Sequence, residues 1–391
     1  MFKIQTFNTI DPDGLSLLSL GEYEVANHFT HPDAIVLRSY DMLEMELPSS
    51  LKAVARAGTG VNNIPIERCT EKGIVVFNTP GANANGVKEM VIAGMLLASR
   101  DIIEGVMWAK SLIGNGSRVP DLIEKGKKKF AGHEIKGKTL AVIGLGAVGV
   151  LVANAARGLG MNVVGYDPYM SVDQAIKLST KVTLVKGLEV LLAQADYVSI
   201  NIPLTPENEG YINKDILNMM KDQVRILNFA RGELVVTKDL IDAIESGKVA
   251  RYVTDFPDEE LMKIDNVITT PHLAASTKES ETNSAVMAVK QVRDFLENGN
   301  ITNSVNFPTA KMERHKGCRI LIANRNIPNM VSQISSILAS EHINIDSMLN
   351  RKYNGNAYNI IDVTRKSIPE SIVQKLNDID GVSMVRLITG D

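Results

Sequence analysis

The stretch 139-TLAVIGLGAVGVLVANAARGLG-160 joins an apolar run to a glycine-rich turn and then to a helix-forming segment. A lone G-x-G-x-x-G pattern is weak evidence, but here a predicted strand precedes it and a predicted helix follows it. The glycines allow a tight turn and a close approach of the backbone to a pyrophosphate, and the helix N-terminus attracts the phosphates. We therefore predict a dinucleotide site formed by Gly144, Gly146, Ala147, Val148 and Gly149.

Asp167 directly follows the next predicted strand, about 20 residues beyond the glycine turn, where a carboxylate can bind the ribose hydroxyls of a dinucleotide. This carboxylate would repel a 2'-phosphate. Residues 166–169 (YDPY) contain no arginine that could bind one. We therefore expect the cofactor to be NAD rather than NADP.

Apolar runs alternate with helical segments on both sides of the turn, which is typical of parallel α/β sheets. The predicted strands cover residues 34–37, 51–55, 73–77, 162–166, 197–200, 224–227 and 267–269. One long helix is expected over residues 87–110, before the Gly- and Lys-rich stretch 114–132. The fold class is therefore α/β, with two doubly wound parallel-sheet domains, one for the substrate and one Rossmann-type domain for NAD.

The chain changes character after the polar linker 299–316. The order that follows is strand, helix, strand, strand, helix, strand, over residues 319–323, 328–342, 345–353, 357–363, 369–379 and 382–388. This βαββαβ order is ferredoxin-like. We expect three domains: a substrate-binding domain of residues 1–98 and 281–306, an NAD-binding domain of residues 99–280 and a regulatory domain of residues 317–391.

The composition excludes several classes of partner. The 391 residues are 45% hydrophobic and carry a net charge of −3, so nothing draws the chain to nucleic acid or to a membrane surface. No apolar run approaches the ~20 residues that span a bilayer, and the amino terminus lacks the pattern of a secretory signal, so we expect a cytoplasmic location. Cys69 and Cys318 stand far apart, and we interpret both as reduced structural residues, with no metal site.

Three candidate catalytic residues follow predicted strand ends, where ligands of open α/β sheets bind. Arg231 in 228-NFARG-232 can hold a substrate carboxylate in a bidentate manner, although a surface ion pair is the simpler alternative. Glu259 in 256-FPDE-259 and His272 after Thr270-Pro271 bring an acid and an imidazole to the same edge. Histidine can take a hydroxyl proton near neutral pH as hydride leaves, and a neighbouring carboxylate stabilises its protonated form.

With 144-GLGAVG-149 and 271-PHLAAST-277, these motifs resemble those of the D-2-hydroxyacid dehydrogenases, and the resemblance spans residues 1–307. It implies that Arg231 anchors the substrate, His272 is the acid-base and Glu259 is its carboxylate partner, with Glu260 as an adjacent alternative. The family has an aspartate beside the nicotinamide two residues before Phe256. This chain has Thr254 there and Asp255 next, so either is a candidate. The expected cofactor contacts also include Thr79, Phe229 and Ala230.

The first domain offers an anion cradle in 56-RAGTGVNN-63, where an arginine is followed by backbone amides that glycines leave accessible. This segment resembles the 3-phosphoglycerate dehydrogenase branch of the family, which implies that Arg56 binds a substrate phosphate. The expected substrate contacts are Arg38, Ser39, Arg56, Ala57, Gly58 and Asn83. The basic run 125–129 is better interpreted as a solvated loop than as charge supplied to a neighbouring subunit, and Lys88 near the hinge has no assigned role.

The terminal domain resembles an ACT domain, an amino-acid-binding regulatory module. The resemblance implies that Asn326 and Asn344 bind a small effector, expected to be L-serine, while Asn324 stands where some relatives have a histidine. A dimerisation module without an effector is the alternative.

The resemblance as a whole implies a homodimer or homotetramer that oxidises 3-phosphoglycerate to 3-phosphohydroxypyruvate with NAD, the first step of L-serine biosynthesis. One alternative keeps the chemistry but uses glyoxylate, hydroxypyruvate or 2-oxoglutarate. A second alternative is a non-catalytic NAD-sensing scaffold.

Overall fold

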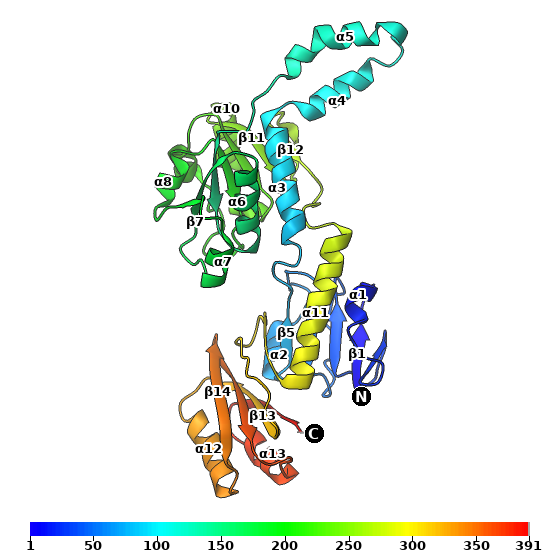
Figure 1. Ribbon diagram of the computed structural model, residues 1–391, viewed down its shortest axis with the longest axis vertical. Coiled ribbons are helices and arrows are strands. Elements are labelled where there is room, and N and C mark those ends of the chain that lie inside the picture. The colour runs from blue at the N-terminus through cyan, green and yellow to red at the C-terminus, as the bar shows by residue number, and fades with distance from the viewer. Residues whose placement is uncertain (390–391) are drawn as a thin grey trace. The chain divides into compact units, whose positions relative to one another are not determined.

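The computed structural model describes residues 1–389 (Figure 1). It divides into two compact units. The first contains residues 1–83 together with the chain from residue 281 onward, and the second contains residues 84–280. Two parallel sheets and one antiparallel sheet confirm the predicted fold class.

The second unit is built on a seven-stranded parallel sheet with strand order β12-β11-β10-β9-β6-β7-β8. Its strands are β6 (Thr139–Ile143), β7 (Asn162–Tyr166), β8 (Thr183–Leu184), β9 (Tyr197–Ile200), β10 (Val224–Asn228), β11 (Val249–Thr254) and β12 (Val267–Thr269). The chain order reverses at β6, which pairs with β7 on one side and β9 on the other. Ligands of open α/β sheets bind at the carboxyl ends of strands beside such a reversal.

Helices and buried apolar clusters cover both faces of this sheet. The main helices are α3 (Ala84–Ser99), α6 (Ala147–Gly158), α7 (Val172–Lys177), α8 (Leu188–Leu192), α9 (Lys214–Met219) and α10 (Thr237–Glu245). Helix α3 packs so tightly that a Cβ on Gly94 would lie 2.9 Å from the Phe229 ring. This packing places α3 with the second unit, so the units divide at residues 83/84 and not after the expected residue 98.

The helix predicted over residues 87–110 is interrupted after Ser99, whose hydroxyl donates to the Met95 carbonyl. A separate helical arm follows: α4 (Ile102–Ser111), η1 (Gly116–Arg118), α5 (Val119–Gly126) and η2 (Lys127–Phe130). The basic run 125–129, interpreted as a loop, is therefore helical. Figure 1 shows α4 and α5 extending away from the seven-stranded sheet, and no residue of α4 is buried.

The first unit contains a five-stranded parallel sheet with order β2-β1-β3-β4-β5. Its elements are β1 (Phe2–Thr6), α1 (Pro12–Leu15), β2 (Tyr23–Ala26), β3 (Ala34–Leu37), β4 (Ala53–Arg56), α2 (Ile66–Glu71) and β5 (Val75–Phe77). Helix α11 (Lys278–Asn298) begins at the boundary between the units and contributes Val289, Val292 and Phe295 to the core of this sheet.

The terminal residues form the predicted βαββαβ unit, an antiparallel sheet with order β14-β15-β13-β16. Its elements are β13 (Cys318–Arg325), α12 (Met330–Ser340), β14 (Ile345–Tyr353), β15 (Asn356–Val363), α13 (Glu370–Asn377) and β16 (Val382–Ile388). One face of the sheet packs on α12 and α13. The other face contributes Leu321, Tyr358 and Ile360 to the same core as Phe77 and Phe295 of the first unit.

Polar contacts reinforce this shared core. The guanidinium of Arg319 pairs with the Asp362 carboxylate at 2.7 Å, and both side chains are buried. Arg319 also donates to the Asn298 carbonyl at the end of α11, and the Tyr358 hydroxyl donates to the Gly299 carbonyl. The terminal sheet is thereby bonded directly to the carboxyl end of α11.

Cys69 and Cys318 lie buried as free thiols. Burial raises the pKa of both, to about 12 for Cys69, which fits a structural role. Among residues 1–389, no helix has the length and apolar character needed to cross a membrane.

Candidate active site

The glycine turn after β6 has the geometry that a dinucleotide requires. Gly144 has a φ of +85°, and a Cβ on Gly149 would lie 1.9 Å from the Gly144 carbonyl oxygen, so both positions need glycine. By contrast, no described heavy atom lies within 4 Å of a Cβ built on Gly146. The space next to Gly146, at the N-terminus of the 12-residue helix α6, is therefore open to a ligand.

Asp167 follows β7 and is held against this turn. One carboxylate oxygen accepts from the backbone N–H of Leu145, and the other accepts from that of Tyr169, both at 2.8 Å. The carboxylate is thus fixed beside the glycine turn, as the expected ribose contact requires.

Arg231 lies three residues beyond the end of β10 and is exposed, with its guanidinium donating to the Ala230 carbonyl at 2.6 Å. Asn228, the last residue of β10, is fully buried. Its amide donates to the Arg231 carbonyl and to the Tyr252 hydroxyl, so it fixes the loop that carries Arg231. We assigned no role to Asn228 or Tyr252 from the sequence, although Asn228 stood inside a motif at a predicted strand end.

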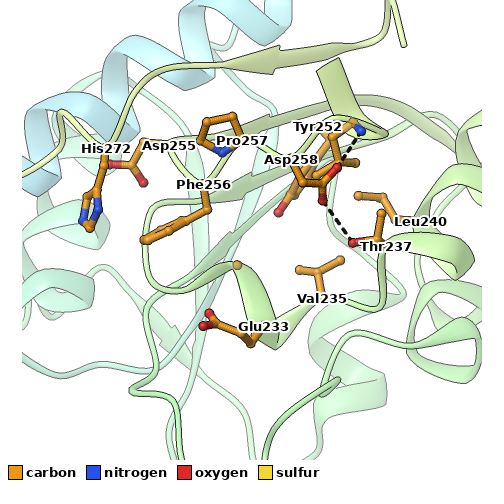
Figure 2. Close-up of a pocket in the computed structure, with 12 residues that line it drawn as sticks. Glu233, Val235, Thr237, Leu240, Tyr252, Asp255, Phe256, Pro257, Asp258 and His272 are labelled. Carbon is orange, nitrogen blue, oxygen red and sulfur yellow. Dashed lines mark hydrogen bonds between the residues drawn. The ribbon is translucent and has the colours of Figure 1, made fainter. Parts of the chain in front are cut away.

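His272 lies in the loop after β12 with a φ of +50°, in the left-handed region that non-glycine residues seldom adopt. Its backbone N–H donates to the carbonyls of Asp255 and Thr270, both at 3.0 Å, and its ring packs on Phe256 with centroids 4.8 Å apart. These contacts hold an exposed imidazole at the edge of a cavity of about 460 Å³ (Figure 2).

Asp255 directly follows β11 and is fully buried. Its Oδ2 accepts from the backbone N–H of Ala274 at 3.0 Å, whereas its Oδ1 has no hydrogen-bond partner among the described residues. Burial raises the pKa of Asp255, and the Ala274 N–H and the nearby charges of His272 and Arg231 oppose that rise. The neighbouring Thr254 differs, because its hydroxyl already accepts from the Phe256 N–H. Asp255 therefore keeps one buried carboxylate oxygen without a hydrogen bond, whereas the Thr254 hydroxyl is already bonded within the protein.

Glu259 is not brought to His272. Its side chain is 83% exposed and pairs with Lys263 at 2.8 Å. Asp258 instead lines the cavity, where its carboxylate accepts from the Leu261 N–H at the start of η4 (Leu261–Lys263) and from the Thr237 hydroxyl (Figure 2). All three acidic residues, Asp258, Glu259 and Glu260, are exposed, and Asp258 is the one that lines the cavity.

The anion cradle lies in the first unit, at the carboxyl ends of β3 and β4, where Leu37 pairs with Arg56. The Arg56 Nε donates to the Arg38 carbonyl at 2.9 Å, and its Nη1 donates to Asn62 Oδ1 at 3.2 Å. A Cβ on Gly60 would lie 2.9 Å from that Nη1, so the glycine loop closes around the guanidinium.

The other predicted substrate and cofactor residues of this unit follow the same strand ends. The backbone N–H of Ser39 donates to Asn8 Oδ1, and the buried Thr79 donates its backbone N–H to the Gly58 carbonyl. The Thr79 hydroxyl is buried with no partner within residues 1–389. Asn83 is the last residue before the unit boundary. Across that boundary, on α3, Lys88 pairs with Glu89 at 3.5 Å.

The predicted effector residues lie on β13 and on either side of α12. Asn324 is buried and accepts from the amide of Asn359 at 2.8 Å, so its carbonyl oxygen is used within the sheet. Asn326 precedes the 11-residue helix α12 (Met330–Ser340) and Asn344 follows it, so the loops that carry them adjoin opposite ends of this helix.

Comparisons with known proteins agree with this geometry. The family model "D-isomer specific 2-hydroxyacid dehydrogenase, NAD binding domain" matches residues 92–274. The chain is 39% identical over 287 residues to a D-3-phosphoglycerate dehydrogenase of Archaeoglobus fulgidus, covering 71% of this chain and 52% of that protein. It is 35% identical over 333 residues to a D-3-phosphoglycerate dehydrogenase of Methanocaldococcus jannaschii, covering 80% and 61%. The chain therefore spans little more than half the length of these relatives.

Solved structures show the same architecture. A cofactor (NAD+) bound 3-phosphoglycerate dehydrogenase of Entamoeba histolytica has a TM-score of 0.60 and 27% identity, covering 78% of this chain and 98% of that one. A glyoxylate reductase from Paecilomyes thermophila has a TM-score of 0.63 and 25% identity, covering 78% and 98%. The family match shows that residues 92–274 of this chain are an NAD-binding domain of the D-isomer specific 2-hydroxyacid dehydrogenase type, and the similarities to these relatives extend beyond that domain.

Proposed function

We propose that this chain oxidises 3-phosphoglycerate to 3-phosphohydroxypyruvate with NAD. The observation that carries the proposal is the pair Arg38 and Arg56, at adjacent strand ends and joined by a hydrogen bond, in addition to Arg231. A 2-hydroxy acid needs one cation for its carboxylate, and a second cationic site suits a second anionic group. The names of the relatives above agree with a phosphate as that group.

The residues around the glycine turn fit NAD. Gly146 leaves the α6 N-terminus open for the pyrophosphate, and Asp167 stands ready for the ribose hydroxyls. Asp255 Oδ1 lacks a partner among the described residues and suits the amide N–H of a nicotinamide, so we assign this contact to Asp255 rather than Thr254. When bound, NAD supplies the hydride acceptor.

His272 takes the substrate hydroxyl proton on its imidazole, and Arg231 holds the substrate carboxylate. The negative charge of Asp255 stabilises the imidazolium that forms, because the two residues interact electrostatically. Glu259 stays a prediction as the partner of His272. It requires the segment around η4 to turn Glu259 away from Lys263 and toward the imidazole.

The direct test follows NADH consumption with a panel of keto acids. We expect phosphohydroxypyruvate to have the highest kcat/KM, and hydroxypyruvate, glyoxylate and 2-oxoglutarate to be poorer. Equal or better turnover of the unphosphorylated acids would assign the chain to another branch of the family. If no keto acid is reduced while NADH still binds, the NAD-sensing scaffold becomes the better explanation.

We further propose that the chain forms a homodimer through its helical arm. Helix α4 exposes Ile102, Ile103, Val106 and Met107, an apolar surface that a second copy would cover. Light scattering should report a dimer for the native chain and a monomer for Met107→Glu. Lys128→Glu on η2 is the matched surface control and should remain dimeric.

We also propose that the terminal βαββαβ segment binds L-serine between two copies of the chain. Asn326 and Asn344 adjoin opposite ends of α12 and would come from different copies. Serine at millimolar concentration should then lower the velocity of the native enzyme. It should have no effect on Asn326→Ala.

A further inference from the structure

Arg38 in the anion cradle is paired with a carboxylate of the protein itself. Its Nη2 lies 2.8 Å from Glu281 Oε1, and the two side chains are 44% and 46% exposed. The Arg38 carbonyl also accepts hydrogen bonds from Arg56 and Asn63, so this residue is an integral part of the cradle. In this structure, therefore, Glu281 is already paired with Arg38, one of the two arginines that would bind a substrate phosphate.

The position of Glu281 is fixed by its neighbours on α11. The backbone N–H of Ser280 donates to the Thr277 hydroxyl, and Ser280 is buried. On the other side, the Thr282 hydroxyl donates to Asp11 Oδ2 at 2.7 Å. Because residues 280 and 282 are both anchored, the backbone of Glu281 is held at the start of α11 with its carboxylate directed to Arg38.

A substrate phosphate and the Glu281 carboxylate would compete for the same guanidinium group of Arg38. A phosphate monoester carries nearly two negative charges at neutral pH and presents three acceptor oxygens to a guanidinium, so it binds arginine more strongly than a carboxylate does. A half-exposed ion pair between Arg38 and Glu281 is weak enough for a phosphate to displace. Anions that bind arginine more weakly than a phosphate monoester would displace the Glu281 carboxylate less often.

We propose that Glu281 is a specificity-determining residue, an internal competitor that occupies Arg38 until a phosphorylated substrate displaces it. The proposal rests on the proposed function, since it takes Arg38 as a contact of the substrate phosphate. It deepens that function in two respects. Glu281 raises the KM for phosphorylated substrates, which favours their release, and it limits occupation of the cradle by free inorganic anions. A substrate without a phosphate has no group of this kind to compete with Glu281 for Arg38, so its binding does not depend on the pair.

The decisive variant is Glu281→Gln, which keeps the shape of the side chain and removes the competing charge. The KM for phosphohydroxypyruvate and the inhibition constant of inorganic phosphate should both fall about three-fold, as expected for loss of one exposed ion pair. The KM for hydroxypyruvate and the kcat should stay unchanged. The matched control is Glu279→Gln, which removes an equal charge from an exposed position two residues earlier on α11. If both variants shift the phosphate constants equally, the effect is general electrostatics and the proposal is wrong.

A binding experiment separates this proposal from the proposed reaction. Calorimetry with inorganic phosphate compares the native protein with Glu281→Gln, Arg38→Gln and the double variant. Phosphate should bind more tightly to Glu281→Gln and more weakly to Arg38→Gln, and the gain should vanish in the double variant. If this pattern holds while phosphohydroxypyruvate is not reduced, the proposed function fails and the role of Glu281 stands. If the ester is reduced but Glu281→Gln binds phosphate like the native protein, the role of Glu281 fails alone.

Discussion

The backbone N–H of His272 donates to the carbonyl of Asp255 at 3.0 Å, so the imidazole and the buried carboxylate are joined through the main chain. Side-chain rotation cannot separate the loops after β11 and β12 while this bond is intact. The left-handed conformation of His272 is held by the same contact. The pair is therefore a fixed element of the site, whereas Glu259 is tied to Lys263 on the surface.

Asp255→Asn should lower kcat/KM at least about ten-fold, because it removes the charge that stabilises protonated His272 and alters the acceptor proposed for nicotinamide. Glu259→Gln is the comparison, and its effect should be smaller if Asp255 is the operative carboxylate. Steady-state kinetics across pH would check both variants. A larger loss for Glu259→Gln would restore Glu259 as the histidine partner and imply that the η4 segment moves on ligand binding.

Asp255 also has a consequence for stability in the absence of cofactor. Burial raises its folded-state pKa, so the native state binds this proton more tightly than the unfolded chain does. The free energy of unfolding should therefore fall as the pH rises from the ordinary pKa of an aspartate through the raised pKa of Asp255. Asp255→Asn should be more stable than the native chain above this window and lose the advantage below it. Urea unfolding at several pH values measures the difference, and parallel pH profiles for the two proteins would contradict the prediction.

His272→Asn should reduce kcat by about a hundred- to ten-thousand-fold through loss of the acid-base group. Asparagine tolerates the left-handed conformation, so the loop should keep its shape and the protein should fold normally. NADH affinity, measured by fluorescence, should stay close to the native value. Retention of full activity would exclude His272 as the base.

Replacing two glycines of the turn with alanine should affect different properties, the stability of the protein in one case and its affinity for NADH in the other. Gly149→Ala drives a methyl group into the Gly144 carbonyl and should cost about 2 kcal/mol or more of stability. Gly146→Ala has free space in the described structure and should unfold at nearly the native temperature, yet bind NADH more weakly. Calorimetric unfolding and NADH titration distinguish them, and unchanged NADH affinity in Gly146→Ala would place the pyrophosphate elsewhere.

Arg319→Met leaves the Asp362 carboxylate buried without its cation and should destabilise the first unit by about 3–5 kcal/mol. The double variant Arg319→Met/Asp362→Leu should recover much of that loss, because no uncompensated charge remains. Chemical denaturation of the three proteins checks the prediction. A double variant no better than the single one would show that the bonds from Arg319 to the Asn298, Met312 and Glu313 carbonyls dominate.

The sequence predicted the parts of the fold that local pattern determines. The glycine turn, the strands beside it and the βαββαβ order follow from periodicity and turn chemistry, and Arg231 and His272 follow predicted strand ends. Asp255 became a candidate only through the family resemblance, as the alternative to Thr254. The features that the sequence did not predict depend on tertiary contacts. The helix breaks after Ser99, and α3 belongs to the second unit, where Gly94 packs against Phe229. No local sequence signal records this packing.

The candidate active site also has features that the sequence could not predict. The three adjacent acidic residues in 258-DEE-260 look equivalent in the sequence, whereas in the structure only Asp258 lines the cavity and bonds to the Leu261 N–H. The pairing of Arg38 with Glu281 joins residues more than 240 positions apart, and only the folded chain brings them together.

The core shared by the first and terminal sheets constrains the order in which the chain can fold during synthesis. The second unit is continuous in sequence and can complete its sheet as soon as residue 280 has emerged. The first unit cannot, because Phe77 packs in one core with Phe295, Leu321 and Tyr358, which are synthesised after the whole second unit. Residues 1–83 must therefore keep apolar surface exposed until these later residues have emerged from the ribosome. In such a chain the terminal strands act as the closing step of folding, and truncation near residue 316 would leave the first sheet without part of its core.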